Sequence, residues 1–320
     1  RRAVAHWAAS AFHSTCRSPP LRVRARARVQ LAMSALDALA DASDNTNLEP
    51  QDVQVLDQIG DGVTSVVFKG LYKGMEVAVK EMLGDVSTMS DRASINLNRE
   101  LTILRKVKHP NLVRFIGVYD VDTRPKIVTE FCNGGTAYDL LHEGGLLTWD
   151  QKLKILLDVS SAMAYLHSVE PPIVHRDLKS LNLLLQNEVT ASTDLPIVKV
   201  TDFGLARMIN AAGNAAQMTK NAGTCHWMAP EVFTSNSYDT QADVYSFSMI
   251  MFEVLCQDIP FYDIAPARLG LVVVQGHRPD MDAVPPDCPQ HLMELMVRCW
   301  TQDASQRPDF HAIVEILQQN

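Results

Sequence analysis

Three oxygen-bearing side chains flank two short apolar segments in the middle of the chain. Asp177 and Asn182 precede Leu183–Leu185, and Asp202 follows Ile197–Val200. Runs of this length and composition are typical of strands, and a hairpin between them would bring the three side chains together. Carboxylate and amide oxygens are the ligands that Mg²⁺ prefers, completed by phosphate oxygens and water. The spacing therefore predicts a magnesium and phosphate site at one end of this hairpin.

A second pair of charged residues lies in hydrophobic surroundings. Lys80 ends an apolar, strand-like stretch, where a lone ammonium is costly to bury without an anionic partner. Glu100 supplies a partner, because Leu97 and Leu104 place it on the packed stripe of an amphipathic helix predicted over 92–107. The two residues form either a structural ion pair or a clamp for a phosphate group.

Two glycines, Gly60 and Gly62, separate strand-like segments, and a hairpin is expected to turn over Gly60–Thr64. Positions without a Cβ let backbone N–H groups approach phosphate oxygens closely. A tight turn would explain the same residues, because a lone G-x-G is a weak signal. Both interpretations remain open at this point.

The remaining elements would hold these side chains in place. From Val53 the pattern is strand-like and predicts two successive hairpins before the first helix. Thr148 and Gln151 form a capping-box start for a long amphipathic helix that ends near His167. The sequence thus predicts a strand-rich first part of the folded region and a mainly helical second part.

The composition is that of an ordinary globular protein, with 47% hydrophobic and 21% charged residues among 320. The net charge of −8 is unevenly distributed. Residues 1–36 carry seven arginines and no acid, whereas residues 37–320 carry 22 basic and 37 acidic side chains. A nucleic-acid-binding surface on the main body is therefore not expected.

Membrane insertion and disulfide bonding are also not expected. The longest apolar stretch, Val244–Cys256, is interrupted by Glu253 and is too short to cross a bilayer, so no integral membrane segment is expected. The six cysteines form no C-x-x-C pair. That pattern favours reduced thiols and a cytoplasmic location.

The first 52 residues differ from the rest. Arg1–Gln30 is rich in Arg, Ala and Ser and lacks acids, which is also typical of an organelle transit peptide. An upstream extension without a folded role is the favoured alternative. Asp41–Pro50 is polar and indicates a linker. We expect residues 1–52 to be a disordered extension and residues 53–318 to form the folded domain.

Six short motifs occur in an order that resembles the signature set of protein kinases. They are Gly60-x-Gly62, Val77-Ala78-Val79-Lys80, Glu100, His175-Arg176-Asp177-Leu178-Lys179-x-x-Asn182, Asp202-Phe203-Gly204 and Ala229-Pro230-Glu231. The later stretches Gly223–Glu231, Cys299-Trp300 and Arg307–Phe310 resemble the tyrosine-kinase-like group of Ser/Thr kinases, near Raf-like and mixed-lineage-like enzymes. The resemblance implies an α+β, two-lobed fold. A small β-rich N-lobe with one helix would span about 53–131, and a larger, mainly helical C-lobe about 132–318.

The resemblance also implies roles for the charged residues near the phosphates. Lys80 would hold the α- and β-phosphates of ATP, and Glu100 would hold Lys80. Asn182 and Asp202 would bind Mg²⁺. These four residues thus account for both cofactors, ATP and Mg²⁺.

Two further residues would act on the substrate. Asp177 is expected to orient the substrate hydroxyl and accept its proton, while Lys179 neutralises charge on the transferred phosphoryl group. Lys179 and Thr224 are both features of the Ser/Thr type.

The nucleotide would lie between the two lobes. In related kinases a glycine loop covers the phosphates, a hinge meets the edge of the adenine, and apolar side chains sandwich its faces. The corresponding positions are Ile59, Gly60, Asp61 and Gly62 in the loop, Glu130 and Cys132 in the hinge with Thr129 behind it, and Val67, Ala78 and Leu184 around the adenine. The third loop glycine is replaced by Ser65, a small residue that the family often tolerates.

Two structural pairs are implied as well. Asp243 could simply be a helix N-cap, but the resemblance makes it a buried anchor for the backbone around His175 and Arg176. Glu231 is expected to form a structural ion pair with Arg307.

The leading interpretation is an active Ser/Thr protein kinase that acts on protein substrates in signalling. A catalytically weak kinase-fold scaffold would be expected to have lost a catalytic residue, and none is lost. A tyrosine or dual-specificity kinase is the third possibility. Thr219 is the expected activating phosphosite, whereas the upstream activator and the physiological substrate are not identified by the sequence.

Overall fold

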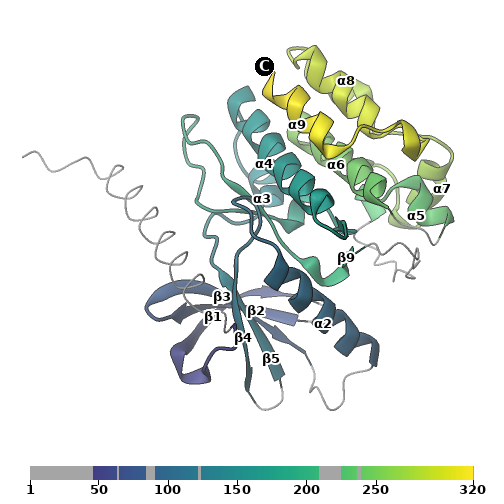
Figure 1. The fold of residues 1–320 in the computed structure, drawn as a ribbon. Helices are drawn as coiled ribbons and strands as arrows, with labels where there is room; N and C mark the ends of the chain where they lie inside the picture. Colours follow the sequence, from purple (N-terminus) through teal and green to yellow (C-terminus); the bar gives the residue numbers. More distant parts are fainter. Residues whose placement is uncertain are drawn as a thin grey trace, which may run out of the picture. The chain divides into compact units, whose positions relative to one another are not determined.

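The computed structural model describes residues 46–62, 65–83, 91–121, 124–208, 225–235 and 239–319. Thr64, Thr219, Gly223 and Thr224, and the predicted extension up to residue 45, lie outside these ranges. Within them, an antiparallel sheet with one helix is followed by a second part built mainly of helices (Figure 1). The expected α+β, two-lobed fold is confirmed.

The first lobe is a five-stranded antiparallel sheet in the order β1-β2-β3-β5-β4. Its strands are β1 (Val53–Asp61), β2 (Ser65–Tyr72), β3 (Met75–Met82), β4 (Phe115–Val121) and β5 (Arg124–Glu130), and a short 3₁₀ turn, η1 (Pro50–Asp52), precedes β1. The β2–β3 hairpin turns over Lys73 and Gly74, whose φ angles of 50° and 82° suit a two-residue turn. The two predicted hairpins are therefore present.

The helix of this lobe is α2 (Asp91–Lys106), which matches the predicted span to within one residue at each end. Leu97 and Leu104 are buried, as their spacing requires, and Glu100 is buried with them. The amphipathic pattern thus brings a carboxylate into the interior of the lobe.

A short segment before β1 also belongs to the fold. Leu48 N donates to Val118 O of β4, and Val118 N donates to Thr46 O, each at 2.8 Å. Arg105 Nε, near the end of α2, donates to Thr46 Oγ1 at 3.1 Å. Gly117 leaves room for this segment, because a Cβ there would come within 2.5 Å of the Leu48 side chain. The predicted linker, residues 41–50, is therefore wrong for Thr46–Leu48.

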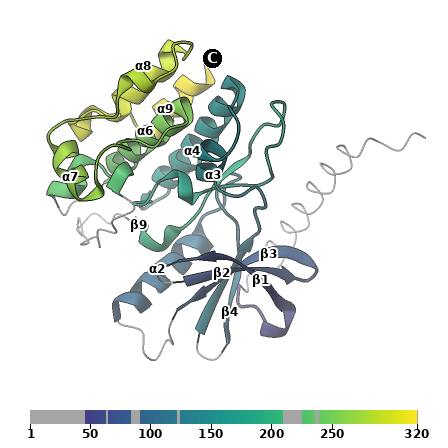
Figure 2. The same cartoon turned by 180° about the vertical axis from the view of Figure 1, so that it is seen from behind.

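The second lobe carries the remaining helices of the described ranges (Figure 2). Four short strands are also assigned there among the described residues. The helices are α3 (Ala137–His142), α4 (Trp149–Ser168), α5 (Pro230–Thr234), α6 (Thr240–Cys256), α7 (Pro266–Val274), α8 (Gln290–Cys299) and α9 (Phe310–Gln318). The strands are β6 (Ile173–Val174), β7 (Leu183–Leu185), β8 (Val198–Val200) and β9 (Arg207–Met208). The 3₁₀ turns are η2 (Ser180–Asn182), η3 (Phe203–Leu205), η4 (Cys225–Trp227), η5 (Met281–Ala283) and η6 (Ala304–Gln306).

The predicted start of α4 is confirmed. Gln151 N donates to Thr148 Oγ1, and the Gln151 side chain accepts a hydrogen bond from Thr148 N. This capping box satisfies backbone donors that the first turn of a helix leaves without partners.

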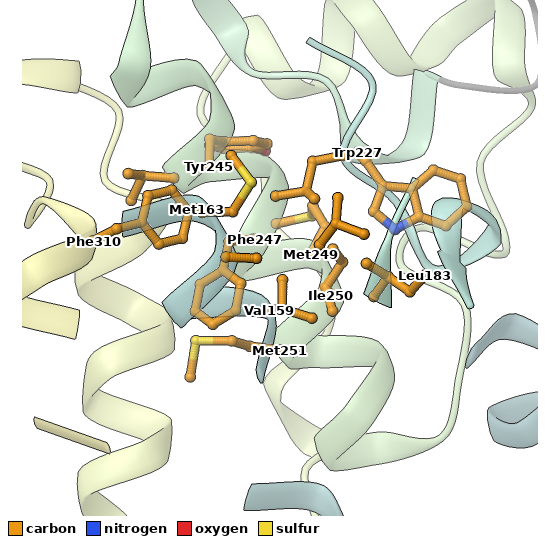
Figure 3. Close-up of a cluster of buried hydrophobic side chains, with 14 of the residues drawn as sticks. Val159, Met163, Leu183, Trp227, Tyr245, Phe247, Met249, Ile250, Met251 and Phe310 are labelled. Carbon is orange, nitrogen blue, oxygen red and sulfur yellow. The ribbon is translucent and has the colours of Figure 1, made fainter. Parts of the chain in front are cut away.

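The core of the second lobe is built around α6. This helix is buried over nearly its whole length, and it packs against α4, α8 and η4. Figure 3 shows the resulting cluster, which includes Val159, Met163, Leu183, Trp227, Tyr245, Phe247, Met249, Ile250, Met251 and Phe310. Two acids, Asp243 and Glu253, are fully buried in this apolar helix.

The expected pair between Glu231 and Arg307 is also confirmed. The two terminal nitrogens of the Arg307 guanidinium, Nη1 and Nη2, donate to Oε1 and Oε2 of Glu231 at 2.6 and 2.9 Å. Arg307 is buried and donates further to the carbonyl oxygens of Thr301 and Gln241. The pair joins the start of α5 to the segment before α9.

No helix in the described ranges combines the length and apolar character that a membrane span needs. The apolar helix α6 is instead enclosed in the core of its lobe.

Candidate active site

The predicted hairpin of β7 and β8 is present. Leu183 pairs with Val200 and Leu185 with Val198. Thr201 N donates to Asn182 O at 3.0 Å, which places Asn182 opposite the residue that precedes Asp202. The two expected metal ligands therefore lie at the same end of one hairpin, although β8 begins one residue later than predicted.

Asp177 lies just before this hairpin and is almost completely buried. Its Oδ2 accepts hydrogen bonds from Lys179 Nζ at 2.8 Å and from Asn182 Nδ2 at 3.0 Å. Its Oδ1 is buried and has no partner among the described groups. Buried acceptors are almost always satisfied in folded proteins, so this oxygen is suited to a donor from outside the chain.

The orientation of the Asn182 amide is fixed by two acceptors. Nδ2 donates to Asp177 O at 2.7 Å as well as to Asp177 Oδ2. An amide nitrogen can only donate, so Oδ1 is the atom that is left for a cation. Oxygen from Asn182 and Asp202 is the donor type that a hard divalent ion prefers.

Asp243 anchors the backbone of the loop, as the resemblance implied. Its Oδ2 accepts from His175 N at 2.8 Å, and its Oδ1 accepts from Arg176 N at 2.9 Å. His167 Nε2 lies 3.0 Å from the same Oδ2. The alternative of a simple N-cap is wrong, because Asp239 caps α6.

His175 joins the loop to the residue that precedes Asp202. Its Nε2 lies 3.0 Å from Thr201 O, and Asp177 N lies 3.3 Å from its Nδ1. A carbonyl oxygen only accepts and an amide only donates, so the ring carries its proton on Nε2. The Phe203 ring packs against the imidazole at 5.5 Å.

Lys80 connects the two lobes electrostatically. Its Nζ lies 2.7 Å from Glu100 Oε1 and 3.5 Å from Asp202 Oδ1. Burial lowers the pKa of Lys80, but the two carboxylates outweigh it, so the pKa is raised and the ammonium stays charged. The Lys80–Glu100 pair predicted from the sequence is confirmed, and it extends to a third residue.

Asp202 is held in an unusual backbone conformation, with φ at 63°. Its Oδ1 accepts from Gly204 N at 3.4 Å. Burial raises the pKa of this carboxyl, but the Lys80 ammonium and the Gly204 N–H outweigh it, so the pKa is lowered. Asp202 therefore remains ionised at neutral pH.

The sheet register brings the other expected nucleotide residues together. Val67 lies opposite both Gly60 and Lys80, and Ala78 lies opposite Thr129. Directly paired residues share a face of the sheet, as do residues two apart in one strand. All five therefore lie on the face that carries the Lys80 ammonium.

The glycine loop is described only in part. Ile59, Asp61 and Gly62 are exposed. Gly62 N donates to Ser65 O at 2.9 Å, so this N–H closes the β1–β2 turn. The turn interpretation is thus correct for Gly62.

The hinge contains an ion pair that the sequence reasoning missed. The Glu130 side chain is buried and its Oε1 lies 2.8 Å from Lys199 Nζ, while it also accepts from Arg114 N at 2.8 Å. Lys199 Nζ donates in addition to Pro110 O. The only sequence feature that indicates the pair is a lone Lys in the apolar strand β8, which needs an anionic partner for the same reason as Lys80.

The residues after the hinge dock on β7. Gly134 N donates to Leu185 O at 3.0 Å, and Leu185 N donates to Gly135 O at 2.9 Å. Cys132 and Leu184 are each half-buried near this junction. Burial, reinforced by Glu130, raises the pKa of Cys132 to about 12, so its thiol stays protonated.

Comparison with known proteins supports the resemblance to protein kinases. Residues 53–317 match the family described as protein tyrosine and serine/threonine kinase. The chain is 35% identical over 292 residues to serine/threonine-protein kinase STY17 of Arabidopsis thaliana, covering 91% of this chain and 48% of that protein. It is 37% identical over 263 residues to the Arabidopsis serine/threonine-protein kinase VIK, covering 81% of this chain and 58% of VIK.

A third relative, serine/threonine-protein kinase STY46 of Arabidopsis thaliana, is 38% identical over 265 residues, which cover 82% of this chain and 43% of STY46. The chain thus spans about half the length of these relatives. The family match covers most of the chain and includes both lobes. The chain therefore belongs to the family of protein tyrosine and serine/threonine kinases.

Proposed function

We propose that this chain transfers the γ-phosphoryl group of ATP to serine and threonine hydroxyls of protein substrates in signalling, with Mg²⁺ as the metal. The observation that carries the proposal is Asp177 Oδ1, a buried acceptor without a partner among the described groups, next to the Lys179 ammonium. A substrate hydroxyl would supply the missing donor. A catalytically weak scaffold would have no need to keep such an acceptor poised.

In the proposed reaction, the substrate hydroxyl donates its hydrogen bond, and then its proton, to Asp177 Oδ1. The hydroxyl oxygen forms a bond to the γ-phosphorus as the bond to the leaving phosphate breaks. Lys179, held 2.8 Å from Asp177 Oδ2, supplies positive charge beside the transferred group. In phosphoryl transfer, positioning of the reactants and neutralisation of charge account for most of the rate acceleration.

Asn182 and Asp202 would hold the divalent cation through Asn182 Oδ1 and the Asp202 carboxylate. When bound, Mg²⁺ neutralises phosphate charge and orients the phosphates for in-line transfer. Lys80 would contact the α- and β-phosphates, and Glu100 fixes its ammonium at 2.7 Å. The raised pKa of Lys80 keeps that charge in place at any physiological pH.

The nucleotide base would occupy the same face of the sheet. Val67 and Ala78 would cover the adenine from the first lobe and Leu184 from the second, with Thr129 behind. Because the Glu130 side chain is engaged by Lys199, Glu130 would contribute through its backbone, as would Cys132. The loop residues Ile59, Gly60, Asp61 and Gly62 would cover the phosphates.

The proposal also includes the domain limits and the location. We assign the kinase domain to residues 53–318, preceded by the segment Thr46–Leu48 that pairs with β4, with the lobes meeting between residues 131 and 132. The spacing of the cysteines supports a cytoplasmic site of action.

The test is an assay with radiolabelled ATP and Mg²⁺ on a generic protein substrate, followed by phosphoamino-acid analysis. Labelled phosphoserine and phosphothreonine are expected with wild type and not with Asp177→Asn. Labelled phosphotyrosine would indicate a tyrosine or dual-specificity kinase. ATP binding without any transfer by the wild type would overturn the proposal and support the scaffold.

A further inference from the structure

Leu181 is an exposed leucine in the loop that carries Asp177, and the chemistry above gives it no role. Its side chain is 43% exposed, although the residues on either side of it, Ser180 and Asn182, are buried. A single exposed leucine is ordinary on a protein surface. This one lies four residues after the carboxylate that would receive the substrate hydroxyl.

The two neighbours of Leu181 turn inward and fix its position. Ser180 Oγ donates to Glu253 Oε1 at 2.7 Å. Asn182 Nδ2 donates to Asp177 O at 2.7 Å and to Asp177 Oδ2 at 3.0 Å. The backbone of η2 is closed by Asn182 N, which donates to the carbonyl oxygen of the residue before the turn at 2.9 Å. The exposed leucine is therefore presented by a rigid turn.

The acid that touches η2 from the interior is not available to a substrate. Glu253 is 0% exposed. Its Oε1 accepts from Ser180, and its Oε2 accepts from Trp227 Nε1 at 2.6 Å. The turn itself contains only Ser, Leu and Asn. A basic side chain of a substrate would thus find no carboxylate on η2 or directly beneath it.

The short helix α3 packs against η2 and adds aromatic groups. His142 Nε2, at its end, lies 3.2 Å from the Glu253 oxygen that also binds η2. Tyr138 lies one turn earlier on the same stripe, with its ring 4.5 Å from the imidazole. Asp139 lies on the next stripe, about 100° around the helix, and its Oδ2 already accepts two hydrogen bonds of the capping box. The stripe of α3 that borders η2 is therefore aromatic.

The separation of Leu181 from Asp177 limits which substrate residue can meet it. Four residues of chain span at most about 14 Å. An extended peptide advances about 3.3 Å for each residue. A substrate side chain that covers Leu181 would thus lie within about four positions of the hydroxyl. Apolar contact there is favourable, whereas a charged group would lose water without gaining a partner.

We propose that Leu181 is a specificity-determining residue, which selects substrates that carry an apolar side chain such as leucine within about four positions of the phosphorylated serine or threonine. The inference rests on the proposed kinase activity and names the class of peptide on which it acts. Leu181 supplies binding away from the reacting atoms, and such binding changes KM and leaves kcat unaffected.

The test uses serine peptides with an alanine background, in which one position at a time, up to four residues before or after the serine, carries Leu, Arg or Glu. Transfer from radiolabelled ATP gives kcat and KM for each peptide. At one position, wild type should prefer Leu to Ala and to Arg by about three- to tenfold in kcat/KM. A closed apolar pocket discriminates more strongly, by about tenfold or more, because it encloses the side chain.

Three variants connect that preference to Leu181. Leu181→Ala should abolish it, and Leu181→Glu should replace it with a preference for Arg at the same position, because a carboxylate pairs with a guanidinium. The new preference should weaken in about 0.5 M NaCl, since exposed ion pairs are screened. The matched control is Leu195→Glu, which adds the same charge at a 53% exposed leucine between β7 and β8 and should keep the preference of wild type. All three should keep the wild-type thermal midpoint.

A wild type that phosphorylates these peptides without favouring Leu at any position would overturn the inference and leave the proposed kinase activity intact. A Leu preference that survives in Leu181→Ala, or that Leu195→Glu removes equally, would also overturn it. If Leu181→Glu does not fold, Leu181→Ala decides: a lost preference supports the inference and a retained one overturns it.

Peptide binding gives a readout that does not need catalysis. The same peptides with alanine in place of serine are labelled with a fluorophore, and their dissociation constants are measured by anisotropy in the presence of a non-hydrolysable ATP analogue. Tighter binding of the Leu peptide than of the Arg peptide to wild type, reversed in Leu181→Glu, supports the inference even if no transfer is detected. Equal binding of the two peptides to wild type overturns it.

Discussion

Lys199 Nζ and Glu130 Oε1 lie 2.8 Å apart beneath the hinge, with only 4% and 8% of the two side chains exposed. Removal of one partner leaves the other as an unpaired buried charge. Lys199→Met should therefore lower the free energy of unfolding by about 3–5 kcal/mol, measured by urea denaturation.

The double variant Lys199→Met, Glu130→Leu separates the ion pair from lost packing. Replacing both members of a buried pair with apolar groups is often close to neutral. The double variant should thus be more stable than Lys199→Met alone, even though Arg114 N also loses its acceptor. A single variant that loses less than about 1 kcal/mol would argue against a net role for the pair.

Asp177→Asn should preserve the fold and ATP binding but remove the proton acceptor at Oδ1. We expect kcat to fall by about 10²–10⁴-fold, the usual value of general-base catalysis. Asp150→Asn, on an exposed position in the first turn of α4, is the matched control. An Asp177→Asn enzyme with more than about half of the wild-type kcat would contradict the assignment, since even the smallest such effect is far larger.

Arg307→Lys tests the value of the guanidinium geometry far from the site. Lysine keeps the charge but cannot bond both Glu231 oxygens and the carbonyls of Thr301 and Gln241 together. Urea denaturation should show a loss of about 2–4 kcal/mol, as for a broken buried pair. ATP affinity is expected to be unchanged; a variant as stable as wild type would show that the pair is not needed.

Four cysteines of the described residues, Cys132, Cys256, Cys288 and Cys299, should resist alkylation in the folded protein. Burial raises the pKa of Cys132 and of Cys256 to about 12 each, and it also raises the pKa of Cys288 and Cys299. At pH 8, iodoacetamide should label Cys132 and Cys256 about 10³-fold more slowly than a free thiol with a pKa near 8.5, measured by peptide mass spectrometry. All six should react in urea. Rapid labelling of native Cys132 would contradict its burial.

The same shifts give stability a defined dependence on pH. Above about pH 8.5 the unfolded chain loses thiol protons that the folded chain retains. The unfolded state then binds fewer protons, so the free energy of unfolding falls as the pH rises. Replacing Cys132 and Cys256 with serine should flatten the decline between pH 8.5 and 10, measured by urea denaturation.

The sequence predicted the parts of the site in which each residue lies in a strand or helix with a clear hydrophobic pattern. Lys80 and Glu100 each lie in a recognisable strand or helix, and the β7–β8 hairpin follows from two apolar runs. Lys199 and Glu253 were equally visible as lone charges in apolar elements. Their partners, however, come from segments that only tertiary packing brings together, so the sequence could not supply them.

Thr46–Leu48 was missed for a different reason. Its contacts with β4 use backbone groups, which carry no side-chain pattern. Polar composition alone suggested a linker, because nothing in the segment indicates which edge of a sheet it accompanies. Gly117 is the one residue that hints at a close neighbour, and a glycine in a strand has several explanations.

The pairing of Thr46–Leu48 with β4 has a practical consequence for producing the domain alone. β4 is the last strand of its sheet, and an uncovered edge strand presents free N–H and C=O groups that recruit other chains. A domain cut at Val53, where the family match begins, would uncover the middle of β4 around Val118 and release the end of α2 from Thr46. The small lobe would then carry a site for self-association, and recombinant protein that starts before Thr46 should be the more soluble of the two.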